Sequence, residues 1–449
     1  MKKKFIVYVT ASMVTMFLQS TYSLIDSVFV SNLINDTALA AITVAWPVIA
    51  VLTALGTGIG CGGAVIMSTK QGEGNEEESD RVRANIIVLL LGLGLIAVII
   101  SEIFLEPLLI LMGARGDLLN LSLQYGRVVI EGGLLQIFSC GLTPLLRNDN
   151  KAVSAMVVMI CGFGLHLGLD YLFLAGFDMG IRGGAAASLC SQLFVTTVCL
   201  IILIRKKKDP LRLSQFTIDT KLWKNILKIA VSPFGISLVP SLLIMYHNIA
   251  AMHSPDQYAV SSYALISSTV GNYRVLLIGI AEGIQPLVSF AHGAGDRDGI
   301  RWIRNHAIAA AYIVSVLLFV FTLATANVSP AIFGYTGDAA KAGAHAVALT
   351  AAQLIFTGMV RVTNSFFYAL GKNAYSLIMI YLDPAFLTPA ILFILPKFMG
   401  SDGIWIAASV AQLILNIIAI KMFINYEKEL KNESCSDTGR TASVRYNEG

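Results

Sequence analysis

Long apolar segments separated by short polar stretches recur along almost the whole chain. Runs such as 86–103 and 307–326 are long enough for a bilayer, whose hydrocarbon core of about 30 Å needs roughly 20 apolar residues per helix. Neither run alternates between polar and apolar positions, as strands of a membrane β-barrel do. The pattern predicts helices over 8–33, 38–68, 84–105, 119–146, 151–175, 181–204, 224–252, 257–290, 304–327, 340–370, 375–397 and 402–425. We therefore expect an all-α integral membrane protein of about twelve transmembrane helices.

The composition agrees with a membrane protein. The 449 residues are 56% hydrophobic and 13% charged, whereas soluble globular proteins carry about 25% charged residues. The mean hydropathy is +0.72. The six cysteines lack metal-ligand spacing and five lie in apolar segments, so we expect small core residues, no metal site and no cofactor. The net charge of +4 does not require a nucleic-acid partner.

Lysine and arginine are distributed unevenly between the two sides of the predicted membrane. The N-terminal Lys2 to Lys4 precede an apolar helix without a signal-peptide cleavage site, so we expect them to lie in the cytoplasm. On that assumption the inside segments hold most basic residues, and the outside loops hold only Arg115, Arg182, Lys341 and Lys397. This asymmetry predicts a multi-pass protein of the cell (plasma) membrane with both termini cytoplasmic.

A polar segment from Arg205 to Lys228 divides the apolar runs into six and six. We expect an N-lobe over 1–208, a cytoplasmic linker over 209–223 and a C-lobe over 224–425. Residues 426–449 have no apolar pattern and are expected to form a disordered cytoplasmic tail.

The two halves repeat each other. A shift of 221 residues aligns Gly58 with Gly279, Gly62 with Gly283 and Gly72 with Gly293, and a shift of 220 aligns Gln192 with Gln412. The shared helix positions favour an internal duplication, with both halves in the same orientation. Two similar lobes facing each other suit alternating access, in which a central cavity opens to one side at a time.

Several short motifs, in a fixed order, carry a family resemblance. They are YSLIDSVFV at 22–30, ALAAI at 38–42, LRND at 146–149, HxxxDY at 166–171, GIRGGA at 180–185, GIAEGIQPL at 279–287 and GAG at 293–295. Together they resemble the bacterial branch of the multidrug and toxic compound extrusion (MATE) family, along almost the whole chain. The resemblance implies a twelve-helix antiporter that exports organic, often cationic, compounds against an inward flow of H⁺ or Na⁺.

Other function classes have less support in the sequence. No phosphate loop, zinc-spaced His/Cys set or Gly-x-Ser-x-Gly elbow is present, so we expect a transporter rather than an enzyme. The alternative is a flippase or exporter of a lipid-linked sugar or natural metabolite from the same superfamily. Acids match or exceed bases among the intramembrane candidates, which favours small organic cations as partners. We expect a monomer in the lipid bilayer.

The ion-coupling site that the resemblance implies lies in the N-lobe, at Asp26, His166, Asp170 and Ser188. Charged residues in a membrane are expensive, with estimates that start at about 2.5 kcal/mol, so each is a functional candidate. The family has Asn where this chain has His166. Imidazole is a poor ligand for a hard cation, so we favour H⁺, with Na⁺ at Asp26, Asp170 and Ser188 as the alternative. His166 could also simply hold Asp170 in a buried pair, or Asp170 could be solvated at the helix end.

Substrate contacts are expected in the C-lobe. Glu282 lies between Gly279 and Gly283, where small neighbours leave room, and a carboxylate there would attract a cation. An ion pair with Arg274 or with another helix is the alternative for Glu282. The other expected contacts are Gln285, Met245, Tyr246 and Asn248. Asp383 precedes Pro384, which predicts a kink in the eleventh helix.

Overall fold

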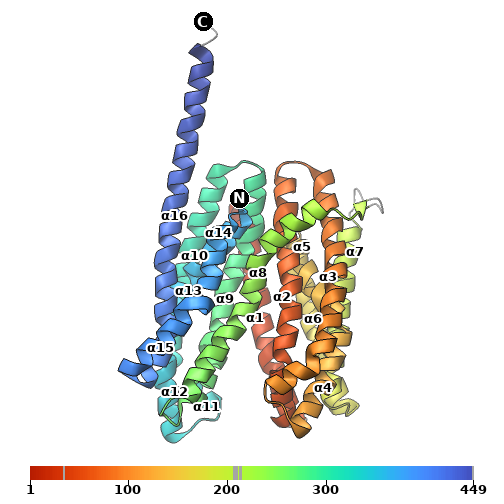
Figure 1. Cartoon of the computed structure of the whole chain (residues 1–449), viewed down its shortest axis with the longest axis vertical. Coiled ribbons are helices and arrows are strands. Elements are labelled where there is room, and N and C mark those ends of the chain that lie inside the picture. Colours follow the sequence, from red (N-terminus) through yellow and green to blue (C-terminus); the bar gives the residue numbers. More distant parts are fainter. Residues whose placement is uncertain (34–35, 206–210, 212–214, 447–449) are drawn as a thin grey trace.

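Long helices form two lobes that stand side by side (Figure 1). The computed structural model describes residues 1–33, 36–205, 211 and 215–446, without the side chains at 22–24, 26–33, 36, 39, 431 and 433–446. The N-lobe sequence forms α1 (Lys2–Leu33), α2 (Asp36–Gly72), α3 (Glu76–Leu111), α4 (Gly116–Glu131), α5 (Gly133–Asn148), α6 (Ala152–Tyr171), the π-helical turn η1 (Leu172–Gly176) and α7 (Ile181–Ile204). The C-lobe sequence forms α8 (Thr220–Met252), α9 (Ala259–Gly293), α10 (Arg297–Thr325), α11 (Ser329–Ile332), α12 (Gly337–Thr350), α13 (Gln353–Ala369), α14 (Asn373–Leu382), the π-helical turn η3 (Asp383–Leu387), α15 (Thr388–Met399) and α16 (Ser401–Tyr446).

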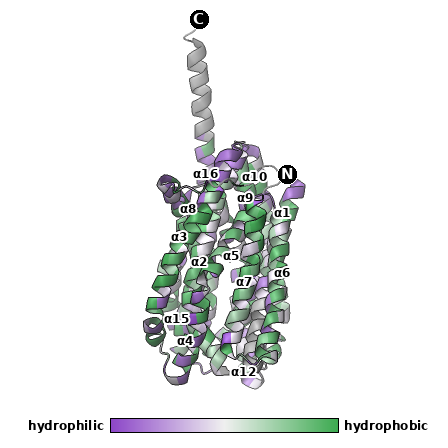
Figure 2. Cartoon of the chain, turned by 90° about the vertical axis from the view of Figure 1, so that its right-hand side faces the viewer, coloured by the Kyte–Doolittle hydropathy of each residue, from purple (hydrophilic) through white to green (hydrophobic). Residues whose placement is uncertain are grey.

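Twelve membrane-spanning units account for these helices. Within the described ranges, nine helices are long and apolar enough to span a membrane, and two bent pairs, α4 with α5 (56°) and α12 with α13 (43°), add two more. Helix α1, with 32 residues, is the twelfth. An apolar belt lies between polar ends (Figure 2) and includes exposed Ile103 and Leu317. The predicted fold class, a two-lobed all-α membrane protein with twelve transmembrane helices, is confirmed.

The helix ends reproduce the sequence repeat. Helices α2 and α9 end at Gly72 and Gly293, and α5 and α13 end at Asn148 and Ala369, so both pairs of ends are 221 residues apart. The caps of α3 and α10, Asn75 and Asp296, have the same spacing, and each side chain accepts a hydrogen bond from a backbone amide three residues later. The bent fourth and tenth spans also correspond. This agreement supports the duplication inferred from the glycine pattern.

The expected linker and tail have different boundaries in the structure. Helix α8 begins at Thr220, so the last residues of the expected linker 209–223 are helical, while most of its first half lies outside the described residues. Residue 426, where the disordered tail was expected to begin, is still part of the packed structure. Tyr426 is buried, and Glu427 pairs with Arg301 and Arg304. Helix α16 continues to Tyr446, and disorder beyond residue 430 stays a prediction.

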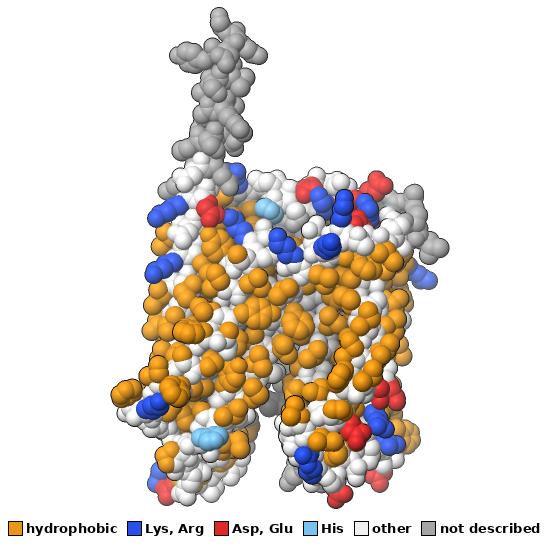
Figure 3. Space-filling view, in the orientation of Figure 1, with side chains coloured by type: hydrophobic (Ala, Val, Ile, Leu, Met, Phe, Trp, Pro, Cys, Tyr) orange, Lys and Arg blue, Asp and Glu red, His pale blue; other side chains and the backbone are white. Residues whose placement is uncertain are grey.

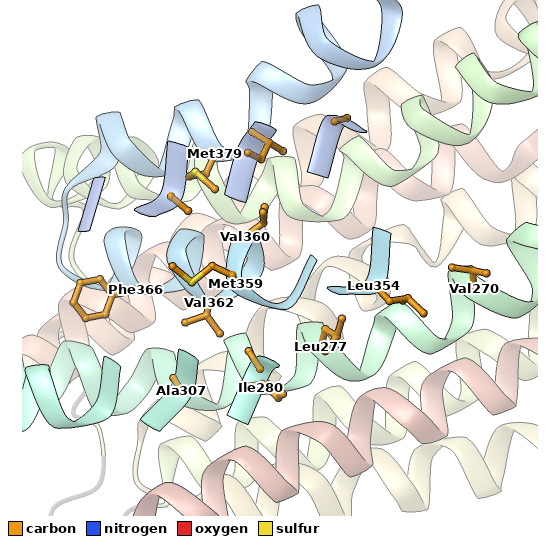
Figure 4. Packing of buried hydrophobic residues seen from close by; sticks show 14 of the residues in the cluster. Val270, Leu277, Ile280, Ala307, Leu354, Met359, Val360, Val362, Phe366 and Met379 are labelled. Atoms are coloured by element: carbon orange, nitrogen blue, oxygen red, sulfur yellow. The ribbon is translucent and has the colours of Figure 1, made fainter. Parts of the chain in front are cut away.

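Apolar side chains fill the interior of each lobe. In the C-lobe, α9 and α13 contribute Leu277, Ile280, Leu354 and Phe366 to one buried cluster, which Figure 4 shows from close by. A separate cluster is formed by α2, α3, α5, α6 and α7 of the N-lobe together with Leu222 and Ile226 of α8. Helix α1 in turn contributes Phe5 and Val9 to the C-lobe cluster. The two cores are therefore distinct, and each includes residues from one helix of the other half of the sequence.

The lobes touch at the end of the molecule that carries both termini, which we call the closed end. There α2 meets α9 so closely that a Cβ at Gly72 would lie 2.1 Å from the carbonyl oxygen of Phe290, and one at Gly293 would lie 1.9 Å from that of Thr69. Ser68 Oγ donates to the carbonyl oxygen of Pro286 at 3.1 Å. Glycine is therefore required at both helix ends. At the opposite, open end the lobes separate, and Figure 3 shows a cleft between them.

Candidate functional site

Three of the predicted ion-coupling residues form a buried cluster in the N-lobe. His166 and Asp170 are four residues apart on α6, so they lie on one face of the helix. His166 Nδ1 lies 3.2 Å from Asp170 Oδ2, and His166 Nε2 lies 2.7 Å from Ser188 Oγ on α7. The exposed fraction is 2% for His166 and 0% for Asp170. The imidazole thus bridges the carboxylate and the hydroxyl.

Close packing of α6 against α7 brings Ser188 within reach. Ser191 Oγ donates to the carbonyl oxygen of Gly162 at 2.8 Å, and a Cβ at Gly162 would lie 2.6 Å from a methyl of Val195. The absence of a side chain at Gly162 therefore lets the two helices approach. Past Asp170 the chain continues as the turn η1, so the carboxylate is inside the lobe. The interpretation of Asp170 as a solvated helix-end residue is wrong.

Asp26, the fourth predicted member, lies in α1, but its side chain is outside the described residues. Helix α1 packs against α6, the helix that carries His166 and Asp170. Among the described side chains, no group of three or more His, Cys, Asp or Glu residues could hold a metal ion. The Na⁺ site at Asp26, Asp170 and Ser188 stays a prediction.

Glu282 and Gln285, both predicted to bind substrate, instead connect the two lobes. Arg147 Nη1 on α5 donates to Glu282 Oε2 on α9 at 2.7 Å, and the two side chains are 9% and 18% exposed. Beside them, Asn148 Nδ2 donates to Gln285 Oε1 at 2.9 Å, and Gln285 Nε2 donates to Asn148 Oδ1 at 3.1 Å. The alternative of an ion pair with another helix therefore describes Glu282, with Arg147 rather than Arg274 as its partner.

A pocket with several polar residues in its lining lies inside the C-lobe, between α8, α9, α13 and α16. Its volume is about 70 Å³, and its lining includes His247, Arg274, Asp383, Trp405 and Gln412. Asp383 begins the turn η3, which interrupts the eleventh span as the Asp-Pro sequence predicted. Its Oδ1 accepts a hydrogen bond from Thr388 Oγ1 at 2.6 Å and its Oδ2 accepts one from Gln412 Nε2 at 3.1 Å. A buried acid with fixed partners thus occurs in each lobe.

The comparison with known proteins decides the family. The family model MatE matches residues 11–172 and 234–383, which is more than half of the chain.

The chain belongs to the MatE family.

Curated relatives of this MatE chain include the multidrug export protein MepA of Staphylococcus aureus (strain NCTC 8325 / PS 47), which is 24% identical over 415 residues. MepA of Staphylococcus saprophyticus is 24% identical over 412 residues, and each alignment covers 91% of this chain and 90% of the relative. The fold is similar to the outward-facing conformation of a multidrug resistance MATE family transporter (TM-score 0.91, 22% identity, 96% and 97% of the two chains covered). It is also similar to MATE in the bent conformation (TM-score 0.88, 23% identity, 97% of each chain covered).

The other predicted substrate contacts of this MatE chain do not line the C-lobe pocket. The neighbouring residues of α8 that line this pocket are Leu243, Ile244 and His247. Met245 is 46% exposed, and Tyr246 packs beside Val239 and Leu243 in a small apolar cluster. Substrate binding by Met245, Tyr246 and Asn248 stays a prediction.

Sequence reasoning missed Arg147 and Asn148 as functional residues because they fall between the predicted helices 119–146 and 151–175. Each is separated from its C-lobe partner by more than a hundred residues, and no local spacing reports such a pairing. Arg127 Nε on α4 lies 3.9 Å from Glu102 Oε1 on α3.

Proposed function

We propose that this MatE protein is a secondary transporter that exports small organic compounds by alternating access, in exchange for inward H⁺. Three findings support the role as an exporter of organic compounds: the family, the MepA relatives and the two-lobed membrane fold. The observation that carries the choice of ion is the His166 ring between Asp170 and Ser188.

Proton coupling fits this cluster for a chemical reason. Na⁺ prefers several oxygen ligands, and the imidazole occupies the space between the carboxylate and the hydroxyl oxygen. Both ring nitrogens already lie within hydrogen-bond distance of an oxygen, so the cluster offers a short path for a proton between His166 and Asp170. We propose Asp170 as the proton-binding carboxylate, with Asp26 as its partner on α1, and His166 and Ser188 as positioning residues.

The orientation of the protein sets the direction of transport. We propose that both termini lie in the cytoplasm, because the basic clusters favour this arrangement. The closed end of the molecule then faces the cytoplasm, and the cleft opens to the outside. In this state a compound leaves to the outside and protons enter the N-lobe. The return step requires that the Gly72–Gly293 contact and the Arg147–Glu282 pair separate.

The pairing of Glu282 bears on the charge of the exported compound. Glu282 was the residue expected to attract a cation, and its carboxylate is paired with Arg147. The preference for cations therefore loses its main support, whereas export of organic compounds keeps the support of the MepA relatives.

The test measures transport of a dye driven by a pH gradient or by a Na⁺ gradient. Inside-out vesicles containing the full chain would receive a pH gradient without Na⁺, or a Na⁺ gradient at fixed pH. We expect transport with the pH gradient, and its loss in Asp170→Asn. Asp338→Asn is the matched control, because Asp338 is an exposed acid on α12. Transport driven equally well by Na⁺ alone, or unchanged transport in Asp170→Asn, would refute proton coupling at this site.

A further inference from the structure

The lining of the C-lobe pocket carries one arginine and one carboxylate, and a second arginine lies near both. Arg274 on α9 lines it beside Asp383. Arg361 on α13 is close enough to interact electrostatically with both Arg274 and Asp383. Guanidinium groups stay protonated in proteins, so two arginines and one carboxylate leave one net positive charge inside an apolar lobe.

The two arginines are not neutralised by the carboxylate through direct contact. Asp383 already accepts hydrogen bonds from Thr388 and Gln412. Within the described side chains neither guanidinium forms a hydrogen bond or an ion pair, and the Nε atoms of both are buried without a partner. Burial of an uncompensated charge is strongly unfavourable, and polar groups inside proteins almost always have partners.

Other buried polar atoms of the pocket also lack partners. His247 is 6% exposed and its Nδ1 donates to the carbonyl oxygen of Leu243 at 2.8 Å, which leaves Nε2 without a partner. Gln412 is 8% exposed, and its Oε1 likewise has none among the described residues. Two hydrogen-bonding side chains that are more than nine-tenths buried therefore line the same small space as Arg274. Their partnerless atoms are acceptors, so they do not contact an oxyanion and would accept from a donor group of the same ligand.

The corresponding positions of the N-lobe lie close together. At a shift of 221, Arg274 corresponds to Thr53 and Arg361 corresponds to Cys140, and at 220 Gln412 corresponds to Gln192. In the N-lobe these three residues converge on one amide: Gln136 Nε2 donates to Thr53 Oγ1 at 3.0 Å and to Cys140 Sγ at 3.3 Å, and Gln192 donates to Gln136. The N-lobe cluster is uncharged. The C-lobe cluster therefore carries arginines where its counterpart carries neutral groups.

We propose that the C-lobe pocket binds the carboxylate, or a similar oxyanion, of an organic compound through Arg274, which lines the pocket, while the nearby Arg361 adds positive charge. The pocket holds the charged end of such a compound and not a whole drug-sized molecule, since its volume is about 70 Å³. Apolar neighbours such as Ile266, Ile404 and Trp405 would contact the attached hydrocarbon. This inference rests on the proposed export function and names its substrate class.

Equilibrium binding tests the inference without any transport step. The purified full chain in lipid nanodiscs would be titrated calorimetrically with 1-naphthoate and with 1-naphthylmethylammonium, which share a ring system and differ in the sign of their charge. We expect 1-naphthoate to bind more tightly. Arg274→Gln should weaken its binding by at least about tenfold, because it removes a charged hydrogen-bond donor from the pocket lining. Arg361→Gln should weaken binding less, because it removes only a nearby positive charge.

Matched variants keep the result interpretable. Arg127→Gln removes an exposed arginine of the N-lobe and should leave binding unchanged. If a glutamine variant fails to fold, Asp383→Asn gives the complementary test, since removal of the carboxylate should tighten binding of 1-naphthoate. Equal or tighter binding of 1-naphthylmethylammonium, or unchanged binding in both arginine variants, overturns the inference. A failure of proton-coupled export would appear only in the vesicle assay and is therefore distinguishable.

Discussion

The Arg147–Glu282 pair should control the balance between the two conformations of the transporter. It joins α5 to α9 across the closed end, at 2.7 Å, with side chains that are 9% and 18% exposed. Glu282→Gln leaves the Arg147 guanidinium without its counter-charge. Loss of one partner of a buried pair costs about 3–5 kcal/mol, and the partial exposure of Glu282 argues for a smaller value, about 2–3 kcal/mol.

That free energy acts only on the conformation in which the lobes touch at the closed end. A change of about 2–3 kcal/mol shifts a two-state equilibrium by roughly 30- to 150-fold. Spin labels at Asp117 and Lys341, which lie on α4 and α12 at the open end of opposite lobes, would report the shift by electron–electron distance measurements (Figure 1). The native cysteines would first be replaced. We expect Glu282→Gln to add a population with a shorter distance.

A control and a coupled variant complete this test. Glu77→Gln removes an exposed acid from the first turn of α3 and should leave the distances unchanged. Because Arg147→Gln in the Glu282→Gln background removes the stranded charge as well, the double variant should recover part of the original distribution. A distance distribution in Glu282→Gln that matches the unaltered protein would refute the role of this pair in closure.

Two further predictions concern helix ends. Gly293→Ala places a Cβ 1.9 Å from the carbonyl oxygen of Thr69, so it should also favour separation at the closed end in the same distance measurement, whereas Gly92→Ala, with no atom within 4 Å, should not. Asp219 caps α8, and the backbone amide of Leu222 together with the Arg81 guanidinium lowers the pKa of its carboxyl. Because this pKa is lowered in the folded state, the stabilisation is present above the usual value of about 3.9 and is lost as the pH falls through the folded-state pKa. Asp219→Ala should therefore lower the thermal midpoint at neutral pH, and the difference from the unaltered protein should shrink as the pH falls below the usual carboxyl pKa of about 3.9. A difference that grows with falling pH would contradict the assignment.

The sequence predicted the features that depend on local periodicity. Transmembrane helices could be placed because long apolar runs leave few other structures possible in lipid. The glycine repeat could be found because close contact between helices requires glycine, and Gly72 and Gly293 indeed meet at the closed end. His166 and Asp170 could be paired because four residues make about one helical turn.

Contacts between helices that are distant in the sequence could not be predicted from local patterns. Glu282 looked like a substrate ligand because its neighbours Gly279 and Gly283 are small. The structure shows that this room is taken up by α1, since a Cβ at Gly279 would lie 2.7 Å from the Cα of Met13, and one at Gly283 the same distance from that of Val9. A small residue beside a charge can thus indicate close helix packing as well as a cavity, and only the tertiary contacts distinguish the two.

The duplication also separates what the two lobes share from what they do not. Helix ends and caps recur at 221 residues because both lobes must pack in the same way. The polar residues inside them differ: His166 and Asp170 lie in the N-lobe, whereas the C-lobe has Arg274 and Arg361 where the N-lobe has Thr53 and Cys140. Selection for packing alone gives no reason for arginines at these two positions in one lobe and neutral residues at the corresponding positions of the other. On our two proposals the asymmetry has a functional reason, since the N-lobe binds the coupling proton and the C-lobe binds the charged end of the exported compound.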